Sequence, residues 1–147
     1  MHTPEGWDLT GKKAVISADR RGWTKFFSSA LAEAGADVAI IGSENSDMEE
    51  ASNKASDYGH TVITQTTNLM SKASIDKSIQ TINDAFGTID ILVNNAKANF
   101  GKRFEKVTES EFDTLMDFNL KSMFLTCQSV GQTMLNKKSG RIINMTS

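Results

Sequence analysis

The sequence contains very little of several residue types that mark particular classes of protein. A single cysteine, Cys127, among 147 residues excludes an internal disulfide and argues against a cysteine-based zinc site. A single proline, Pro4, argues against linkers and low-complexity segments. Neither sign of charge dominates, since 16 Lys and Arg face 18 Asp and Glu, and the net charge of −2 provides no field that gathers nucleic acid.

Long hydrophobic runs are absent as well. No apolar run approaches the length that crosses a membrane, and residues 1–5 do not begin a signal peptide. The two histidines, His2 and His60, are too far apart in the pattern to make a metal site. The composition therefore predicts a soluble, cytoplasmic protein that binds no metal, membrane or nucleic acid.

What the sequence does have is a regular alternation of short apolar runs and longer helical patterns. Each apolar run has the length of a buried parallel strand, and the runs cover residues 13–17, 37–41, 61–65, 89–93 and 141–145. Helical periodicity connects them over residues 22–34, 46–59, 72–86 and 108–138. Repeated strand–helix units with short joints predict an α/β fold: a doubly wound, Rossmann-like parallel sheet in strand order 3-2-1-4-5 with helices on both faces.

Capping signals mark several helix ends. Ser46-Asp-Met-Glu49 and Thr108-Glu-Ser-Glu111 have the pattern of capping boxes, and Gly35 follows the first helix as a stop. That helix presents apolar side chains on one face, which is expected to pack inward: Phe26, Phe27, Ala30, Leu31 and Ala34. The last helix repeats apolar side chains at a spacing typical of a core or a subunit interface: Met116, Leu120, Met123, Phe124, Cys127, Val130 and Met134.

Small and polar residues follow each apolar strand. In a doubly wound sheet, ligands bind beyond the carboxyl ends of the strands, near the switch in strand order. Polar tips at residues 17–22, 42–44, 67–69, 94–97 and 146–147 therefore predict a polar crevice along one edge. The first tip leads into a helix and can offer backbone N–H groups to a phosphate. Arg20 and Arg21 add positive charge there, although composition alone also fits two solvated loop residues.

Several motifs in order make the resemblance to a family specific. From about Leu9 to Ser147 the chain resembles the N-terminal part of the short-chain dehydrogenase/reductase family, of its Tyr-dependent type. Residues 90–97 are similar to the segment that holds the family's Asn-Asn-Ala-Gly motif, and residues 140–147 match the strand that ends at the active-site serine. Further matches are the opening strand, the first helix-to-strand joint and the central helix at residues 9–16, 32–38 and 118–124.

The resemblance implies an NAD(P)-dependent oxidoreductase that moves a hydride between nicotinamide and a carbonyl or alcohol substrate. Carried over residue by residue, Ser147 orients the substrate oxygen and Asn119 organises a water in the proton path. The implied cofactor-binding residues are Ser17, Ala18, Arg20, Arg21, Gly22, Trp23, Ser43, Asn68, Leu69, Asn95, Ala96 and Lys97. We expect residues 1–10 to form an arm and residues 11–147 a dinucleotide-binding domain that is incomplete at its C-terminus.

The chain departs from the family pattern in the first loop. The family reads Thr-Gly-x-x-x-Gly-x-Gly there, whereas this chain has Ser17, Ala18, Gly22 and Thr24, so one of the three glycines remains. The methyl group of Ala18 is small. The β-branched Thr24 is expected to shift the start of the helix or to move the pyrophosphate outward.

Two further departures lie at later strand ends. The Asn-Asn-Ala-Gly motif ends here in Lys97, which the resemblance places beside the adenosine ribose. Asn68 stands where the family usually has an aspartate near the adenine, and its amide can still hydrogen-bond that base.

The cofactor preference follows from the second strand tip. NAD-binding sheets usually place an acid there for the ribose 2′-hydroxyl, but this chain has Gly42 and Ser43. Arg21 occupies a position where related NADP users carry a basic residue. These features favour NADP(H) over NAD(H), and Glu44 is the charge that argues the other way.

The catalytic Tyr-x-x-x-Lys pair of the family is absent from the sequence. The only tyrosine, Tyr58, is followed by Gly, His, Thr and Val, and we expect it far from the crevice. The sequence therefore predicts a fragment that is inactive by itself, from a parent that is a homo-oligomer through the helix at residues 108–138. Alternatives are a non-catalytic nucleotide sensor or scaffold on the same fold, a phosphate-accepting signalling domain, and a protein–protein module that uses an open edge of the fifth strand.

Overall fold

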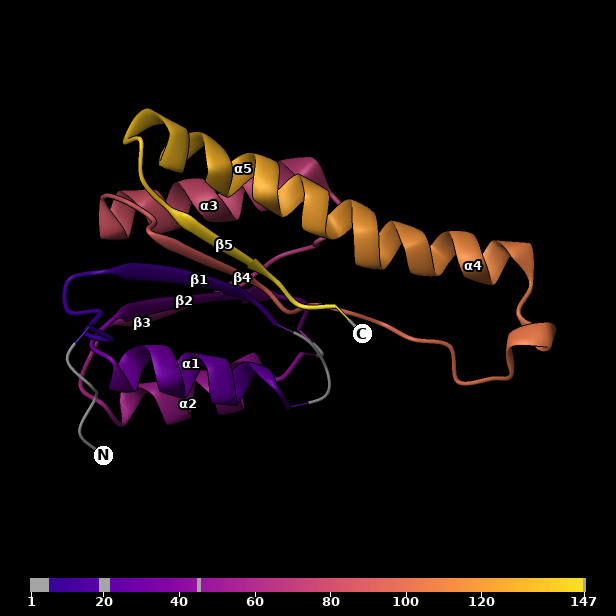
Figure 1. The fold of residues 1–147 in the computed structure, drawn as a ribbon, viewed down its shortest axis with the longest axis horizontal. Coiled ribbons are helices and arrows are strands. Elements are labelled where there is room, and N and C mark those ends of the chain that lie inside the picture. Colours follow the sequence, from indigo (N-terminus) through magenta and orange to yellow (C-terminus); the bar gives the residue numbers. More distant parts are fainter. Residues whose placement is uncertain (1–5, 19–21, 45, 147) are drawn as a thin grey trace.

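A five-stranded parallel sheet forms the centre of the computed structural model, which describes residues 6–18, 22–44 and 46–146 (Figure 1). The strand order is β3-β2-β1-β4-β5, as predicted. Because every pair is parallel, all five carboxyl ends lie at one edge of the sheet. The strands are β1 (Lys13–Ser17), β2 (Asp37–Gly42), β3 (Val62–Thr66), β4 (Ile91–Asn94) and β5 (Arg141–Asn144).

Helices cover both faces of the sheet. Figure 1 shows α1 (Thr24–Glu33) and α2 (Met48–Ser56) on one face and α3 (Lys72–Phe86) and α5 (Ser122–Asn136) on the other. The helix α4 (Glu109–Met116) continues the line of α5 beyond the end of the sheet. A short 3₁₀ turn at Phe104–Lys106 precedes it. This arrangement confirms the predicted Rossmann-like fold.

The three central strands β1, β2 and β4 bury both of their faces, whereas β3 is partly buried and β5, at the edge, is exposed. Along β1, the neighbours Val15 and Ile16 point to opposite sides, and each belongs to a different hydrophobic cluster. The first cluster joins the sheet to α3 and α5 through residues such as Ile79 and Val130. The second joins it to α1 and α2 through residues such as Ala51. Burial on both faces explains why β1, β2 and β4 are unbroken apolar runs in the sequence.

Two strands begin later than predicted because pairing sets their start. Val62 is the first residue of β3 and pairs with Val38, and Ile91 is the first of β4 and pairs with Ala14. The predicted starts at residues 61 and 89 were therefore wrong by one and two positions. Gly42 pairs with Thr66 and extends β2 by one residue.

The buried face of α1 differs from the predicted one. Thr24, Ser28 and Ala32 are the buried residues, whereas Phe26 is 59% exposed and Ala30 is exposed. The small side chains bring α1 close to α2, since the Ser28 hydroxyl donates to the Ala51 carbonyl at 3.0 Å. Phe27 and Leu31 pack against the core as predicted. The prediction was wrong for Phe26 and Ala30, because close helix packing here buries small residues.

The predicted capping box at residues 46–49 does not form. The Ser46 hydroxyl donates to the Ser43 carbonyl at 2.6 Å, and Asp47, at the N-cap position of α2, makes no side-chain cap bond. A carboxylate oxygen of Asp47 instead accepts the Thr24 N–H at 3.2 Å. By contrast, the box at Thr108 and Glu111 is confirmed. The first box does not form because Asp47 bonds to α1, which is distant in the sequence. The second forms because its two residues are only three positions apart.

The pattern predicted as one helix over residues 108–138 is interrupted. A π-helical segment at Asp117–Lys121 separates α4 from α5. The α5 residues Val130 and Met134 are buried, but Leu120 and Phe124 remain largely exposed. Only the second half of the helix therefore packs on the sheet.

Two carboxylates tie the amino ends of the strands together, at the edge opposite the predicted crevice. Asp37 pairs with the Lys13 ammonium and accepts the Thr61 N–H at 2.8 Å. Asp90 accepts the Lys13 N–H at 2.9 Å and pairs with Lys137 at 2.5 Å. Burial acts to raise the pKa of both carboxyls, but the bonds from lysine and backbone outweigh it, so each pKa lies below its usual value.

These pKa shifts predict a loss of stability in acid. A carboxyl with a lowered pKa in the folded state stabilises the fold fully above its unfolded pKa, about 3.9, and this contribution disappears as the pH falls through the folded value. We expect the free energy of unfolding, measured in denaturant between neutral pH and acid, to fall most steeply below about pH 4. The Asp37→Asn, Asp90→Asn double variant should be less stable at neutral pH and should show a shallower acid slope. An unchanged slope would contradict this account.

Candidate functional site

The tips of the two central strands are joined by one hydroxyl. Ser17 ends β1 and is 2% exposed. Its Oγ accepts the backbone N–H of Asn95 at 2.9 Å and that of Ala96 at 3.0 Å. A serine at this position therefore provides the acceptor for two buried N–H groups just beyond β4. It fixes the path of the chain at the point where the strand order reverses.

A cavity of about 820 Å³ lies at the carboxyl edge of the sheet. Residues from the tips of four strands line it, and among them are five predicted site residues: Ala18, Ser43, Asn68, Leu69 and Lys97. The volume falls within the usual range of small-molecule sites. The predicted crevice therefore exists, and it lies where a doubly wound sheet places its ligand.

Two residues that replace family glycines fit the structure. Ala18 is buried, and a Cβ on Gly42 would lie only 3.0 Å from the Ala18 methyl, so the bare glycine of β2 leaves room for that methyl. Thr24 begins α1, two residues after the predicted start, and its hydroxyl accepts an Asn95 amide hydrogen at 3.3 Å. Thr24 thus connects the start of α1 to the tip of β4.

One side of the cavity is formed by the segment after β3. Leu69 is 5% exposed and joins the hydrophobic cluster next to α3. The Asn68 side-chain oxygen accepts the Met70 N–H at 3.0 Å, which leaves its amide hydrogens as donors at the cavity wall. An apolar side chain beside an amide donor suits a nucleotide base. These residues therefore fit the adenosine half of a dinucleotide.

The side chain of Asn119 holds the loop after β4. Its Oδ1 accepts the Ala98 N–H at 2.7 Å, and its Nδ2 donates to the Ala98 carbonyl at 2.8 Å. Asn119 lies in the π-helical segment, which turns this side chain toward the loop. Both ends of the predicted active-site amide are therefore bonded to one backbone unit.

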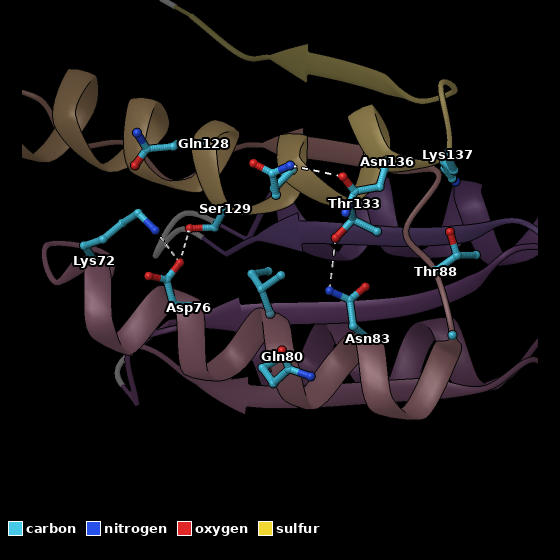
Figure 2. A pocket seen from close by; sticks show the side chains of 13 residues that line it. Lys72, Asp76, Gln80, Asn83, Thr88, Gln128, Ser129, Thr133, Asn136 and Lys137 are labelled. Carbon is cyan, nitrogen blue, oxygen red and sulfur yellow. Dashed lines mark hydrogen bonds and ion pairs between the residues drawn. The ribbon is translucent and has the colours of Figure 1, made fainter.

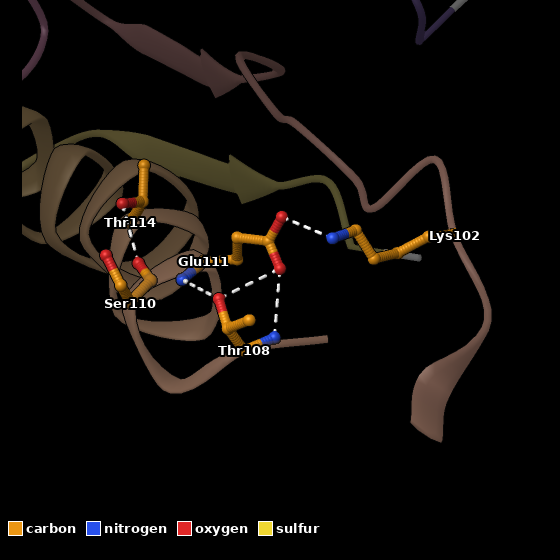
Figure 3. A network of polar contacts seen from close by, with 5 residues as sticks. All are labelled: Lys102, Thr108, Ser110, Glu111 and Thr114. Carbon is orange, nitrogen blue, oxygen red and sulfur yellow. Dashed lines mark hydrogen bonds and ion pairs between the residues drawn. The ribbon is translucent and has the colours of Figure 1, made fainter. Parts of the chain in front are cut away.

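The far wall of the cavity was not predicted. It comes from the loop after β4 and from α4, and Figure 3 shows how Lys102 and Glu111 join the two segments by an ion pair of 2.5 Å. Glu111 also accepts the Thr108 N–H at 2.9 Å. The Lys102 ammonium and the Thr108 backbone lower the pKa of Glu111 to about 2. The capping box was the one signal in the sequence that pointed to this wall.

Three polar groups of different exposure meet where β4 and β5 end: Asn94 is buried, Cys127 is partly buried and Asn144 is exposed. The Asn94 amide donates to the Asn144 side-chain oxygen at 2.8 Å and to the Cys127 sulfur at 3.2 Å. Burial raises the pKa of the Cys127 thiol, and the Asn94 bond opposes this only in part. The thiol is therefore a neutral packing group between α5 and the sheet.

The other predicted site residues either do not line the cavity or lie outside the described part of the chain, and Ser17, Asn95 and Ala96 are among those that do not line it. Gly22 takes a φ of +75° ahead of α1, and Trp23 is 54% exposed with its ring 5.8 Å from that of Phe26. Neither lines the cavity. Arg20, Arg21 and Ser147 lie outside the described residues. Tyr58 follows α2 and is exposed, away from the cavity, as predicted.

A second cavity, of about 930 Å³, lies between α3 and α5 (Figure 2). Its polar side chains bond to each other: Asp76 pairs with Lys72 and accepts the Ser129 hydroxyl, and Asn83 donates to Thr133 at 3.1 Å. Across the described ranges, no cluster of His, Cys, Asp and Glu could hold a metal ion, and no helix in them is long and apolar enough to cross a membrane. Because the polar side chains of the cavity between α3 and α5 bond to each other, the cavity at the carboxyl edge of the sheet is the candidate site.

A parallel sheet in this strand order, with a cavity at the switch between β1 and β4, defines a nucleotide-binding protein of the Rossmann-like class. The family model described as short chain dehydrogenase matches residues 12–147. The chain belongs to the short-chain dehydrogenase family.

Curated relatives agree with this assignment. The chain is 34% identical over 140 residues to a 3-oxoacyl-(acyl-carrier-protein) reductase of Vibrio cholerae, covering 95% of this chain and 56% of the relative. It is 33% identical over 139 residues to the dehydrogenase subunit BbsD of Thauera aromatica, which acts on a hydroxy(phenyl)methylsuccinyl-CoA, with the same coverage. The chain thus spans little more than half the length of these relatives.

Solved structures share the fold. A putative short-chain alcohol dehydrogenase from Sinorhizobium meliloti superimposes with a TM-score of 0.86 at 29% identity, over 96% of this chain and 56% of that one. An NAD+-bound xylitol dehydrogenase superimposes with a TM-score of 0.85 at 22% identity, over 95% and 54% of the two chains. The chain therefore has the fold of the corresponding part of these structures.

Proposed function

We propose that the chain is the nucleotide-binding part of a cytoplasmic, NAD(P)-dependent oxidoreductase that transfers a hydride between nicotinamide and a carbonyl or alcohol substrate. The observation that carries the proposal is the cavity lined by predicted site residues from four strand tips. Its shape and lining suit the adenosine half of a dinucleotide, and when bound the dinucleotide supplies the hydride chemistry.

The residues of the chain have distinct parts in this proposal. Ser17 fixes the backbone at Asn95 and Ala96, directly before Lys97 in the cavity wall. Asn68 donates to the base, and Asn119 organises a water while its two bonds hold Ala98 in place. Ser147, outside the described residues, hydrogen-bonds the substrate oxygen.

The proton step needs a group that these 147 residues do not contain. General acid–base catalysis contributes about a hundredfold to ten-thousandfold, and the sequence holds no Tyr-x-x-x-Lys pair. We therefore expect the chain alone to reduce no carbonyl substrate. The assay measures the absorbance of reduced nicotinamide, which should not decrease. Turnover by the purified chain would contradict this part of the proposal.

A titration with both cofactors tests the proposed function. We expect the chain to bind NADPH more tightly than NADH, because the tip of β2 carries Gly42 and Ser43 in place of an acid. Fluorescence of the reduced nicotinamide during titration gives both dissociation constants. Tighter binding of NADH would overturn the cofactor preference, and binding of neither would overturn the proposed function.

An exposed apolar stripe supports a homo-oligomer through α4 and α5. Phe112, Met116, Leu120 and Phe124 recur at every fourth position and are 39% to 61% exposed. Burying a large apolar side chain contributes about 1.5–3 kcal/mol, so we expect Leu120→Glu with Phe124→Glu to raise the dimer dissociation constant at least about a hundredfold. Sedimentation equilibrium measures it, with Phe104→Glu as a control off the stripe. A wild-type chain that stays monomeric at every concentration would refute the interface.

A nucleotide sensor or scaffold on the same fold is the second candidate. The replacement of two family glycines by Ala18 and Thr24 favours it, because both positions border the phosphate-binding loop. A sensor and an enzyme both bind the dinucleotide, so binding does not separate them. A Tyr-x-x-x-Lys pair further along a longer form of the chain supports the enzyme, and its absence supports the sensor.

A further inference from the structure

Lys97 departs from the family motif, and the structure holds it in an unusually defined position. The residue before it, Ala96, donates its N–H to Ser17 Oγ at 3.0 Å. The residue after it, Ala98, is bonded through both its N–H and its carbonyl to Asn119. Lys97 is therefore the one residue between two fixed backbone units, so its side chain leaves the loop from a fixed point.

The charge of Lys97 is unpaired in the described part of the chain. Its side chain is half-buried and lines the 820 Å³ cavity, yet it makes no ion pair or hydrogen bond to any described residue. Lys102, the other lysine of this wall, is neutralised by Glu111 at 2.5 Å. The remaining described acid of the cavity, Glu44, is exposed at the tip of β2. Lys97 is thus the free cation of the described cavity wall.

We propose that Lys97 is a specificity-determining residue that binds a phosphate of the adenine nucleotide. An ammonium on a half-buried side chain that lines the cavity is a good partner for a phosphate, since charge-assisted hydrogen bonds are stronger than neutral ones. The strand order places the β4 tip next to the β1 tip, whose loop leads into α1, with the β2 tip just beyond. The lysine supplies positive charge at the β4 tip, in a chain whose first loop motif keeps one of the family's three glycines. This inference rests on the proposed function and adds a residue that the family motif does not provide.

The test compares adenine ligands that differ only in phosphate. The full chain and its Lys97→Met and Lys97→Arg variants are titrated calorimetrically with adenosine, ADP and adenosine 2′-monophosphate. Lys54→Met, an exposed lysine near the end of α2, controls for the change in net charge. We expect Lys97→Met to weaken a phosphate-bearing ligand about tenfold or more, to leave adenosine within about twofold, and Lys97→Arg to restore most of the loss.

The two nucleotides separate the sources of the phosphate. If Lys97→Met loses affinity for ADP, Lys97 binds the 5′-diphosphate. If it loses affinity for adenosine 2′-monophosphate, Lys97 binds the phosphate on the ribose. Either result supports the inference. The inference would be overturned if Lys97→Met lost as much affinity for adenosine as for the two nucleotides. It would also be overturned if Lys97→Met bound all three ligands as tightly as Lys54→Met does. Neither result would contradict the proposed function. If the wild-type chain binds none of the three ligands, the proposed function fails as well.

Discussion

Replacing Ser17 with alanine is expected to lower the free energy of unfolding by about 2–6 kcal/mol, because a buried donor left without an acceptor costs about 1–3 kcal/mol and Ser17→Ala leaves two donors without one. The two donors are the N–H groups of Asn95 and Ala96. Both residues are almost fully buried, so water cannot readily replace the hydroxyl. Denaturant unfolding followed by circular dichroism measures the change.

A second buried serine gives a matched control. Ser28 is fully buried in α1, and its hydroxyl donates to the carbonyls of Lys25 and Ala51 rather than accepting from N–H groups. Ser28→Ala therefore leaves no N–H without a partner and should cost less than about 1.5 kcal/mol. Ser17→Thr keeps the hydroxyl and should retain most of the stability. If Ser17→Ala lowers the free energy of unfolding no more than Ser28→Ala does, the Ser17 hydroxyl does not have the stabilising role proposed for it.

Replacing Asn119 with alanine is expected to weaken dinucleotide binding about tenfold to a hundredfold, since ordering one backbone residue costs about 1–2 kcal/mol and the loop must then be ordered by the ligand. The substitution removes both bonds to Ala98 and frees the segment that carries Lys97. The fold should persist, because Asn119 packs no hydrophobic cluster. Titration with NADPH measures the affinity.

The control for Asn119 is an asparagine of the same helical stretch. Asn136 ends α5 at the far side of the molecule, is exposed, and accepts only the Gln132 amide at 3.1 Å. Asn136→Ala should leave NADPH affinity within about twofold of wild type, the accuracy expected for distant, independent sites. An Asn119→Ala variant that binds like Asn136→Ala would show that the loop is rigid without this side chain.

The sequence predicted the strand tips because two local rules suffice to locate them. Each strand is a continuous apolar run, and a parallel sheet brings all carboxyl ends to one edge. Ala18, Asn68 and Lys97, from three separate strands, accordingly line one cavity. No side-chain partner had to be known for that prediction.

The parts that sequence reasoning missed depend on distant partners. The predicted face of α1 was wrong in part, because the contact with α2 is made by Ser28, whose hydroxyl bonds to Ala51, 23 residues away. The capping box at Ser46 was wrong because Asp47 bonds to the start of α1. The wall of the cavity at Lys102 and Glu111 rests on an ion pair across a loop, and periodicity carries no information about such a pair.

The measurement that tests the central claim most directly is amide chemical-shift mapping of the isotope-labelled chain during titration with NADPH. The account predicts that the largest shifts fall at the strand tips that line the cavity, around Ala18, Ser43, Asn68 and Lys97. Shifts concentrated between α3 and α5, around Asp76 and Ser129, or no shifts at all, would contradict it.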